Sequence, residues 1–561
     1  MDNSAASQDS RTLGTEIYMD RVQAAWGNYN GLSGSRLRVV FFAGLVFLCA
    51  ATAFVGAVPT RVFGHDIFVP LDAGWRVING QRPHLDFVSG WGPVWFLVEG
   101  LGLTVSRYSV DGIGYANAIM ALVVGTWCFF LGKDRLASIP RILLGWFLAA
   151  LVAAPYPLGI TPFWPSHAMA YNRYGYALLG LILLECVGRV HSSQESSKEG
   201  WIGGFSTGAA LGLTLFLKAS YFFVGIVLIG VLALLLGRLV LRRLIAVVVG
   251  FSLVSISILG YLRFDVVAAL GDLRMAGASR AGALEAQTVI SKASPHWPTL
   301  LLMMVFVFAA ISLSGNWIPR WKGLRLVGAG ALILLADIGL MSTNAQQGGF
   351  PLCAVFAVLV INEILWQQLP LTATPTRSSR PLFAVALGLG VLLFFPQFMS
   401  DIVGISYGVW SKQKVRNGTQ AAQFTSPDLR PLLLYDFSST PQSNGTFFVN
   451  YVNDGVALLQ SQTRPDETVI TIDMTNPFSY ALQRRPARAG IESPTYHFNI
   501  DDDHRPSDDR FFGNADIVMV PKRPALDTYY FLDFYRAYEP GLKQRYYLAA
   551  ESPLWWMYRR K

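Results

Sequence analysis

Long apolar runs dominate the first 400 residues of this 561-residue chain. As a helix, a run of about twenty residues is long enough to cross a hydrocarbon layer of roughly 30 Å. Runs of this kind predict eleven membrane spans, at residues 38–59, 111–131, 139–157, 174–190, 201–217, 221–237, 243–262, 298–315, 325–342, 350–369 and 381–399. We therefore predict a polytopic α-helical membrane protein.

The composition agrees with a membrane protein. Hydrophobic residues make up 52% of the chain, and charged residues make up only 14%. The net charge of +9 does not point to a nucleic-acid partner, because much of the Lys and Arg excess lies in short connections between apolar runs. The four cysteines, Cys49, Cys128, Cys186 and Cys353, all lie inside apolar runs, which argues against a disulfide framework and a CxxC metal site.

Basic residues gather in alternate connections between the predicted spans. Residues 133–141, 238–243, 316–325 and 370–380 carry them, whereas the short connections on the other side are poor in Lys and Arg. The positive-inside rule predicts a cytoplasmic N-terminal tail at residues 1–36 and a transmembrane domain at residues 37–400, with long outer loops at 61–110 and 263–297. An odd number of spans places residues 401–561 on the extracytoplasmic side of the inner (plasma) membrane.

Residues 401–561 are more polar and more aromatic than the spans. Strand-like runs occur at residues 468–472, 516–520, 546–549 and 555–558, and the last two flank a turn at residues 551–553. Between the first two runs, Asn476 followed by Pro477 is typical of the start of a helix. These patterns predict a small extracytoplasmic α/β domain that ends in a hairpin.

A polar stretch at residues 61–93 follows the first predicted span. It contains the carboxylates Asp66, Asp72 and Asp86, together with basic residues. Charge gathered in an outer loop suits an enzyme that works at the lipid surface, whereas a transporter is expected to carry its functional charges inside the spans. Asp66 follows the first span by only a few residues, which puts its carboxylate at about the depth of the lipid headgroups.

The three aspartates each leave alternatives open. Asp66 is either a free carboxylate or the N-cap of the helix that we predict at residues 69–79. Asp72 and Arg76 are four residues apart, so they share one face of that helix and can form an ion pair. Asp86 lies in a turn-like segment, where it either organises the loop or contacts an acceptor.

The order of residues in this stretch resembles a known pattern. His65-Asp66 is followed by LDAGWR at residues 71–76, by NGQRPHLDF at residues 79–87 and by Gly92-Pro93. An acid just outside the first span, then D-A-G-x-R-x-x-x-G-x-x-P-x-x-D-F and a Gly-Pro segment, is similar to the first outer loop of GT-C fold glycosyltransferases. The likeness is to the bacterial relatives of protein O-mannosyltransferases and of the lipid A aminoarabinose transferase, and it covers about forty residues closely.

The resemblance implies a GT-C-like membrane glycosyltransferase of cell-envelope glycan biosynthesis. Such an enzyme moves a sugar from a polyprenyl-phosphate-linked donor to a lipid, glycan or protein acceptor on the extracytoplasmic face. An inverting transfer needs a carboxylate base for the acceptor hydroxyl and positive charge for the departing lipid phosphate. Asp66 is the first candidate for the base, and Asp72 and Asp86 are further candidate acids. The candidate phosphate partners are His65, Arg76, Arg173, Lys218, Arg274 and Arg280, although basic side chains near span ends can instead snorkel to lipid headgroups.

No metal ion or other cofactor is required on this reading, because a polyprenyl monophosphate leaves less charge to neutralise than a nucleotide diphosphate. The run DDDH at residues 501–504 keeps a divalent cation open as an alternative, although runs of acids in polar loops are usually solvated. Other functional classes also remain open: a transporter or flippase of lipid-linked sugars, a polysaccharide polymerase or ligase, and a non-catalytic assembly protein. A transporter is expected to repeat one half of its sequence pattern in the other, and no such repeat is apparent.

Overall fold

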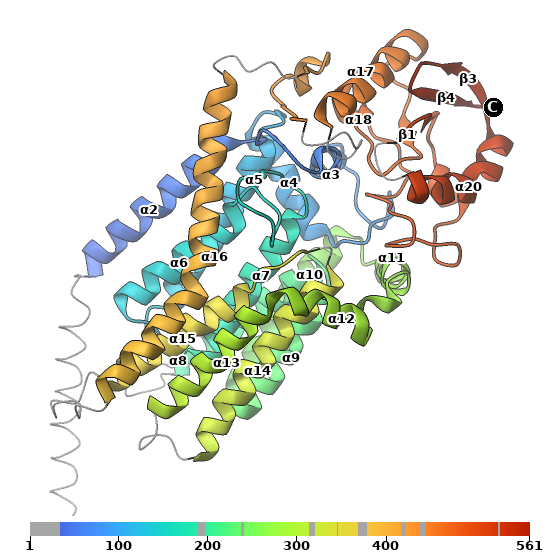
Figure 1. Ribbon diagram of the computed structural model, residues 1–561. Coiled ribbons are helices and arrows are strands. Elements are labelled where there is room, and N and C mark those ends of the chain that lie inside the picture. Colours follow the sequence, from blue (N-terminus) through green and yellow to red (C-terminus); the bar gives the residue numbers. More distant parts are fainter. Residues whose placement is uncertain are drawn as a thin grey trace, which may run out of the picture.

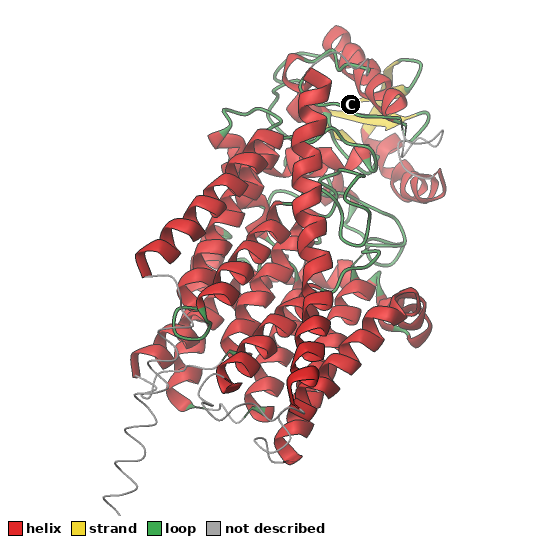
Figure 2. Ribbon diagram, turned by 60° about the vertical axis from the view of Figure 1, so that its left-hand side comes forward, coloured by secondary structure: helices red, strands yellow, loops and turns green. Residues whose placement is uncertain are grey.

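The computed structural model describes residues 34–188, 197–236, 240–313, 320–344, 346–368, 379–416, 422–436, 444–524 and 528–561. A bundle of long helices carries a smaller domain at one end, and the C-terminus lies in that domain (Figure 1). The strands are confined to this domain within the described residues (Figure 2). We call the end of the bundle that meets it the domain end. Most of the predicted cytoplasmic tail, residues 1–33, lies outside the described residues.

Each of the eleven predicted spans coincides with a helix. Six helical segments in the described part of the chain are long and apolar enough to cross a membrane, by length and composition. The chain is therefore a multi-pass integral membrane protein. The helices are α2 (Gly34–Val55), α5 (Gly112–Leu131), α6 (Ser138–Ala153), α7 (Ala170–Val187), α8 (Ser197–Leu215), α9 (Ala219–Leu235), α10 (Leu241–Tyr261), α13 (Trp297–Leu313), α14 (Arg320–Thr343), α15 (Pro351–Gln368) and α16 (Ser379–Arg416).

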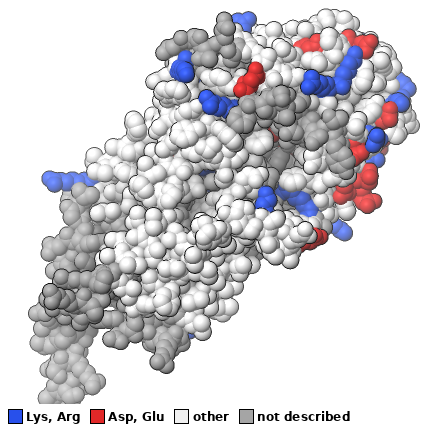
Figure 3. Space-filling view, in the orientation of Figure 1, with Lys and Arg blue, Asp and Glu red and all other residues white. Residues whose placement is uncertain are grey.

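The outer surface of the bundle is apolar. Large hydrophobic side chains such as Phe47, Leu241 and Phe308 are 70% or more exposed in the protein alone. In Figure 3 the charged side chains gather over the C-terminal domain and the adjoining end of the bundle, while the rest of the described bundle surface is nearly free of them. An apolar surface of this extent is stable only when it faces lipid.

Glycines let α8 and α10 approach closely. A Cβ atom at Gly208 would lie 2.0 Å from the Val247 carbonyl oxygen, and one at Gly250 would lie 2.2 Å from the Phe205 carbonyl oxygen. Backbone contact of this kind supplies van der Waals packing, which matters in a bilayer because apolar side chains gain little by leaving lipid. A larger residue at either glycine would push the two helices apart.

Acidic side chains inside the bundle have structural partners. Glu185 forms ion pairs with Arg135 at 2.9 Å and with Arg243 at 3.1 Å. Asp337 of α14 accepts a hydrogen bond of 2.9 Å from the backbone N–H of Cys353, in the first turn of α15. A carboxylate at a helix N-terminus satisfies free N–H groups there and interacts favourably with the helix dipole. These acids therefore join helices to one another.

Four shorter helices lie at the domain end of the molecule. They are α3 (Phe68–Ile78), α4 (Pro93–Val105), α11 (Val266–Ala278) and α12 (Ala286–Ala293). α3 matches the helix predicted at residues 69–79. At 13 residues, α4 is only about 20 Å long and is too short to cross a hydrocarbon layer.

The C-terminal domain is built on a four-stranded sheet with the strand order β1-β2-β4-β3. β1 (Val469–Thr471) and β2 (Ile517–Pro521) are parallel, and β4 (Trp555–Arg560) pairs antiparallel with β2 and with β3 (Tyr546–Glu551). Alternate strand residues face two separate cores, one containing α17 (Gly445–Gln462) and the other α20 (Thr528–Arg545). The four predicted strands, the terminal hairpin and the α/β character are confirmed.

The last long helix contains its predicted span and is longer than it. α16 continues to Arg416, beyond residue 400, where the apolar run ends. Just beyond the apolar run, Asp401 is fully buried in an ion pair of 2.9 Å with Arg173 of α7, so a charged residue of α16 sits inside the packed bundle. A smaller difference concerns α18 (Phe478–Ala481), whose N-cap is Pro477 rather than the expected Asn476.

Candidate active site

A cavity of about 570 Å³ lies at the domain end, among α9, α11, α14 and a loop of the C-terminal domain. Its walls are mostly apolar, and its two charged side chains are both cations, Lys218 and Arg280. A volume of this size suits a small-molecule or lipid ligand. The lining residues are Gly90, Trp91, Tyr171, Lys218, Ala219, Ser220, Phe223, Val224, Leu273, Ala276, Gly277, Arg280, Ala283, Leu284, Gly339, Thr343, Phe498 and Asn499.

Lys218 lies in the connection between α8 and α9 and is the N-cap residue of α9. The ammonium donates a hydrogen bond to the Asn344 side-chain carbonyl and lies 4.8 Å from the centre of the Tyr171 ring. Burial, and to a smaller extent the neighbouring Arg280, lowers the pKa of Lys218 well below its ordinary value. An anion bound beside this lysine would favour its charged form.

Arg280 follows α11 and lines the same cavity as Lys218. Its guanidinium donates to the Thr343 carbonyl oxygen at 2.5 Å and to the Phe498 carbonyl oxygen at 3.2 Å, and it lies over the Phe498 ring. Burial lowers the pKa of Arg280 to about 10, so the group is still charged at neutral pH. Two carbonyl bonds leave further N–H groups of this side chain for a ligand.

The two cations lack acidic partners. Among the described residues, no carboxylate lies within ion-pair distance of Lys218 or Arg280. Burying a charge without a counter-ion costs free energy. The cavity is therefore suited to an anionic group attached to an apolar body.

His65 and Asp66 lie in a short 3-10 turn, η1 (Gly64–Ile67), which a left-handed residue, Phe63 (φ 52°), precedes. His65 Nε2 is 3.2 Å from Asp66 Oδ1, and the histidine side chain is only 3% exposed. Burial opposes the charged imidazole, but Asp66 and Asp473 outweigh it and hold the pKa of His65 above its ordinary value. No side chain caps α3, which rules out the N-cap alternative for Asp66.

Tyr171 connects this acid to the cavity. Its ring contacts Trp91, with the ring centres 5.1 Å apart, and both residues line the cavity wall. Tyr171 interacts electrostatically with Asp66 and also with Arg280. Asp66 is thus within electrostatic range of Tyr171 in the cavity wall, although it does not itself line the cavity.

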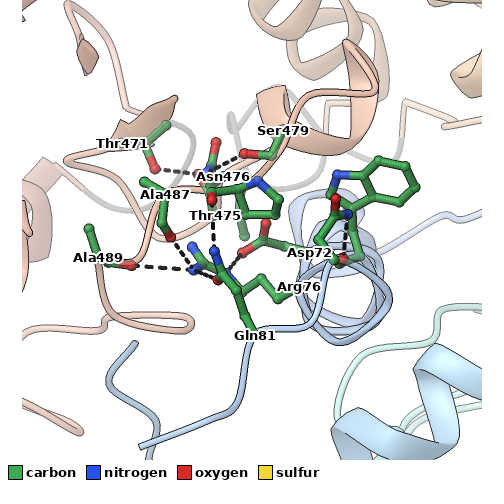
Figure 4. A network of polar contacts seen from close by, with 12 residues as sticks. Asp72, Arg76, Gln81, Thr471, Thr475, Asn476, Ser479, Ala487 and Ala489 are labelled. Atoms are coloured by element: carbon green, nitrogen blue, oxygen red, sulfur yellow. Dashed lines mark hydrogen bonds and ion pairs between the residues drawn. The ribbon is translucent and has the colours of Figure 1, made fainter. Parts of the chain in front are cut away.

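Asp72 and Arg76 form the ion pair that their spacing predicts, with Arg76 Nε at 2.7 Å from Asp72 Oδ2. Arg76 also donates to the Gln81 side chain at 3.0 Å and to the carbonyl oxygens of Ala487 and Ala489 at 3.1 and 3.3 Å. Figure 4 shows this guanidinium between α3 and the C-terminal domain. Arg76 therefore fastens the first outer loop to that domain and lies outside the cavity lining.

A second carboxyl group, Glu492, accompanies Asp72. Burial raises the pKa of Asp72, and burial together with Asp72 raises the pKa of Glu492 well above its ordinary value. The two carboxyl groups influence each other, because Asp72 raises the pKa of Glu492 while Glu492 opposes the rise at Asp72. This pair lies between α3 and the C-terminal domain.

The remaining candidate residues also lie outside the cavity lining. Asp86 accepts the Arg82 backbone N–H at 2.8 Å and pairs with Arg488 at 3.3 Å, so it organises the turn. Arg173 is 2% exposed and bound to Asp401. Arg274 is exposed on α11. The structure thus brings Lys218 and Arg280 into one cavity lining, places Asp66 within electrostatic range of Tyr171 in that lining, and gives the others separate surroundings.

Several residues at the domain end were not anticipated from the sequence. Asp272, Glu492 and Phe498 contact residues that lie far away along the chain, and no local pattern marks them. In the described ranges, no group of three or more His, Cys, Asp or Glu side chains is arranged to hold a metal ion.

No protein-family model matches the chain. One curated relative is a putative chloride channel protein, ClcB-like, from Ralstonia nicotianae. It is 28% identical over 181 residues, which make up 31% of this chain and 39% of that protein. The match therefore spans well under half the length of the relative.

Solved membrane transferases are similar over most of the chain at low identity. The structure of ArnT from Cupriavidus metallidurans bound to undecaprenyl phosphate has a TM-score of 0.46 and 12% identity, covering 94% of this chain and 98% of that one. An Archaeoglobus fulgidus oligosaccharyltransferase tethered with an acceptor peptide gives 0.42 and 11%, covering 92% and 74%. The mycobacterial arabinofuranosyltransferase AftD gives 0.38 and 13%, covering 94% and 40%. With TM-scores below 0.5, these likenesses do not by themselves assign a fold or an activity.

Proposed function

We propose that this chain is a GT-C-type membrane glycosyltransferase that moves a sugar from a polyprenyl-phosphate-linked donor to an acceptor hydroxyl. The observation that carries the proposal is the apolar cavity lined by two half-buried cations, Lys218 and Arg280, together with Asp66, which interacts electrostatically with Tyr171 of the cavity wall. A polyprenyl phosphate combines an anionic head with a long apolar tail, which matches this lining. The motif around Asp66 and Asp72 supports the same class.

The donor binds with its phosphate between Lys218 and Arg280 and its chain against the apolar wall, which includes Phe223, Val224 and Leu284. Charge-assisted hydrogen bonds from the two cations hold the phosphate oxygens. The same bonds strengthen as negative charge grows on the leaving phosphate.

Asp66 serves as the base in this proposal. The acceptor O–H loses its proton to the Asp66 carboxylate while the oxygen forms a bond to the anomeric carbon of the sugar. The bond from that carbon to the phosphate oxygen breaks on the opposite side, and its electron pair leaves with the lipid phosphate. The anomeric configuration is inverted, and His65 steadies the carboxylate before and after the transfer.

The placement of the reaction is also part of the proposal. The distribution of Lys and Arg favours a cytoplasmic N-terminus and an extracytoplasmic domain end in the inner membrane, where lipid-linked sugars rather than nucleotide sugars serve as donors. We propose that no metal ion takes part, because the two cations already compensate a monophosphate. A lipid, a glycan or a protein can serve as the acceptor.

The experiment is a transfer assay on the full chain reconstituted in vesicles, with polyprenyl-phosphate sugars, a panel of acceptors and EDTA. The wild type is expected to release polyprenyl phosphate, and Asp66→Asn is expected to lower the rate by about 10²- to 10⁴-fold, the usual contribution of a general base. Full activity of Asp66→Asn would remove Asp66 from this role. Loss of activity in EDTA would contradict the metal-free mechanism.

A transporter is the second candidate, because buried cations also bind small anions and part of the chain is similar to a putative chloride channel. The same vesicles can be loaded with chloride or with a lipid-linked sugar. Movement of either across the bilayer by the wild type, without any transfer product, would favour transport over catalysis.

A further inference from the structure

The buried carboxylate of Asp272, on α11, joins three distant parts of the chain. Arg510 of the C-terminal domain contacts both of its oxygens, at 2.5 and 3.1 Å. His84 Nδ1 lies 3.0 Å from the same carboxylate, and the Ser89 backbone N–H donates to it at 3.2 Å. The Asp272 side chain is 0% exposed, whereas the Arg510 side chain is 37% exposed, so a buried carboxylate is reached from the surface by its cation.

α11 is also a wall of the cavity. Leu273, Ala276 and Gly277 line it directly, and Arg280 follows the helix by two residues. The helix packs closely on the first outer loop, since a Cβ atom at Gly90 would lie 3.2 Å from the Ala276 Cβ atom. A small shift of α11 therefore moves Arg280 relative to Lys218.

The C-terminal domain reaches the cavity a second time through Phe498 and Asn499. The Asn499 side chain accepts the Thr495 N–H at 2.7 Å and donates to the Ser493 carbonyl at 2.8 Å, which fixes the shape of this loop. Phe498 then presents its carbonyl and ring to Arg280. The domain thus contacts both ends of the segment that runs from Asp272 to Arg280.

We infer that Asp272 is a positioning residue whose ion pair with Arg510 fixes α11 against the C-terminal domain and so sets the separation of the two phosphate-binding cations. This inference rests on the proposed function, in which Lys218 and Arg280 bind one phosphate. It makes the C-terminal domain part of the donor site. Donor affinity then depends on an ion pair that does not touch the donor.

The test compares Arg510→Gln with Arg488→Gln in the full chain in detergent or nanodiscs. Arg488 provides a matched control, because its ion pair with Asp86 also joins the C-terminal domain to the first outer loop but does not involve α11. Hydrogen exchange of residues 266–278 is measured without ligand. Binding of farnesyl phosphate, a soluble prenyl monophosphate, is measured separately.

Arg510→Gln is expected to speed exchange in residues 266–278 and to weaken farnesyl phosphate binding by at least about tenfold, because it leaves the buried Asp272 carboxylate without its charged partner. Arg488→Gln is expected to change neither. Arg510→Lys keeps the charge without the two-pronged geometry and is expected to lie between the wild type and Arg510→Gln. Arg510→Lys also provides the test if Arg510→Gln does not fold.

The two proposals fail in different ways. Unchanged exchange in both Arg510 variants would overturn the positioning role of Asp272, whatever the ligand. Faster exchange with unchanged farnesyl phosphate affinity would also overturn it, because α11 would then not set the cation spacing. If the Arg510 variants exchange faster but the wild type itself binds no farnesyl phosphate, the ion pair does hold α11 in place, and the proposed donor site is refuted instead.

Discussion

Binding of a lipid phosphate is predicted to take up a proton at Lys218. In the free protein this lysine is buried without a carboxylate partner, so its pKa lies well below the ordinary value. Above that lowered pKa the amine is neutral. A phosphodiester bound beside it favours the ammonium, so the pKa in the complex is higher than in the free protein. Between these two pKa values, binding and protonation are linked.

The size of the effect follows from the same contacts. Up to about one proton enters per ligand, and the dissociation constant rises by about tenfold per pH unit within the linked window. Loss of the cation in Lys218→Met removes a charge-assisted hydrogen bond of about 1.5–3 kcal/mol, which weakens binding by about 10- to 150-fold. Arg280 remains charged and retains part of the affinity.

Isothermal titration of the reconstituted protein with a prenyl phosphodiester, in two buffers of different ionisation enthalpy, measures the proton uptake directly. Lys218→Arg is the matched control, because its guanidinium carries charge without titrating and is expected to bind with no proton uptake at this position. Equal proton uptake by the wild type and by Lys218→Arg would refute the reasoning.

Three further predictions concern the acids and bases of the first outer loop. Asp66→Asn is expected to lower kcat without a comparable change in donor affinity, with the exposed Asp509→Asn as the control, and a loss confined to donor affinity would contradict the base role. Arg76→Met is expected to lower the Tm and destabilise the fold by about 3–5 kcal/mol, because it leaves Asp72 buried without its partner, and Asp72→Asn in the same chain should recover part of the loss. The folded-state pKa of His65 is raised, so its stabilising charge is present below the ordinary pKa of about 6.5 and is lost as the pH rises through the folded value. The Tm difference between the wild type and His65→Gln should therefore be larger at pH 6 than at pH 9, and an unchanged difference would contradict the ion pair with Asp66.

Much of the fold is readable from the sequence because lipid imposes a simple rule. An apolar run of sufficient length becomes a helix whatever its neighbours, and all eleven predicted spans have one. Alternation and turn residues likewise predict the strands of the C-terminal domain. The burial of Asp401 within α16 was not predictable, because its ion-pair partner, Arg173, lies 228 positions away along the chain.

The candidate site was only partly predictable for the same reason. Proximity to the first span singles out Asp66, and a place between two apolar runs singles out Lys218. A four-residue spacing predicts the ion pair of Asp72 and Arg76, but not that Arg76 also bonds backbone carbonyls of the C-terminal domain. The roles of Asp272 and Phe498 depend on contacts among three segments that are far apart in the sequence, so no local pattern predicts them.

Charged side chains inside the molecule differ in how their charge is compensated. Glu185, Asp337 and Asp401 each have a cation or backbone N–H groups as partners inside the bundle. Lys218 and Arg280 are half-buried, and the described residues around them supply carbonyl oxygens and aromatic rings and no carboxylate. Those neutral partners compensate such a cation only in part. A ligand that brings its own negative charge would complete the balance, which is why the cavity favours a lipid phosphate over a neutral lipid.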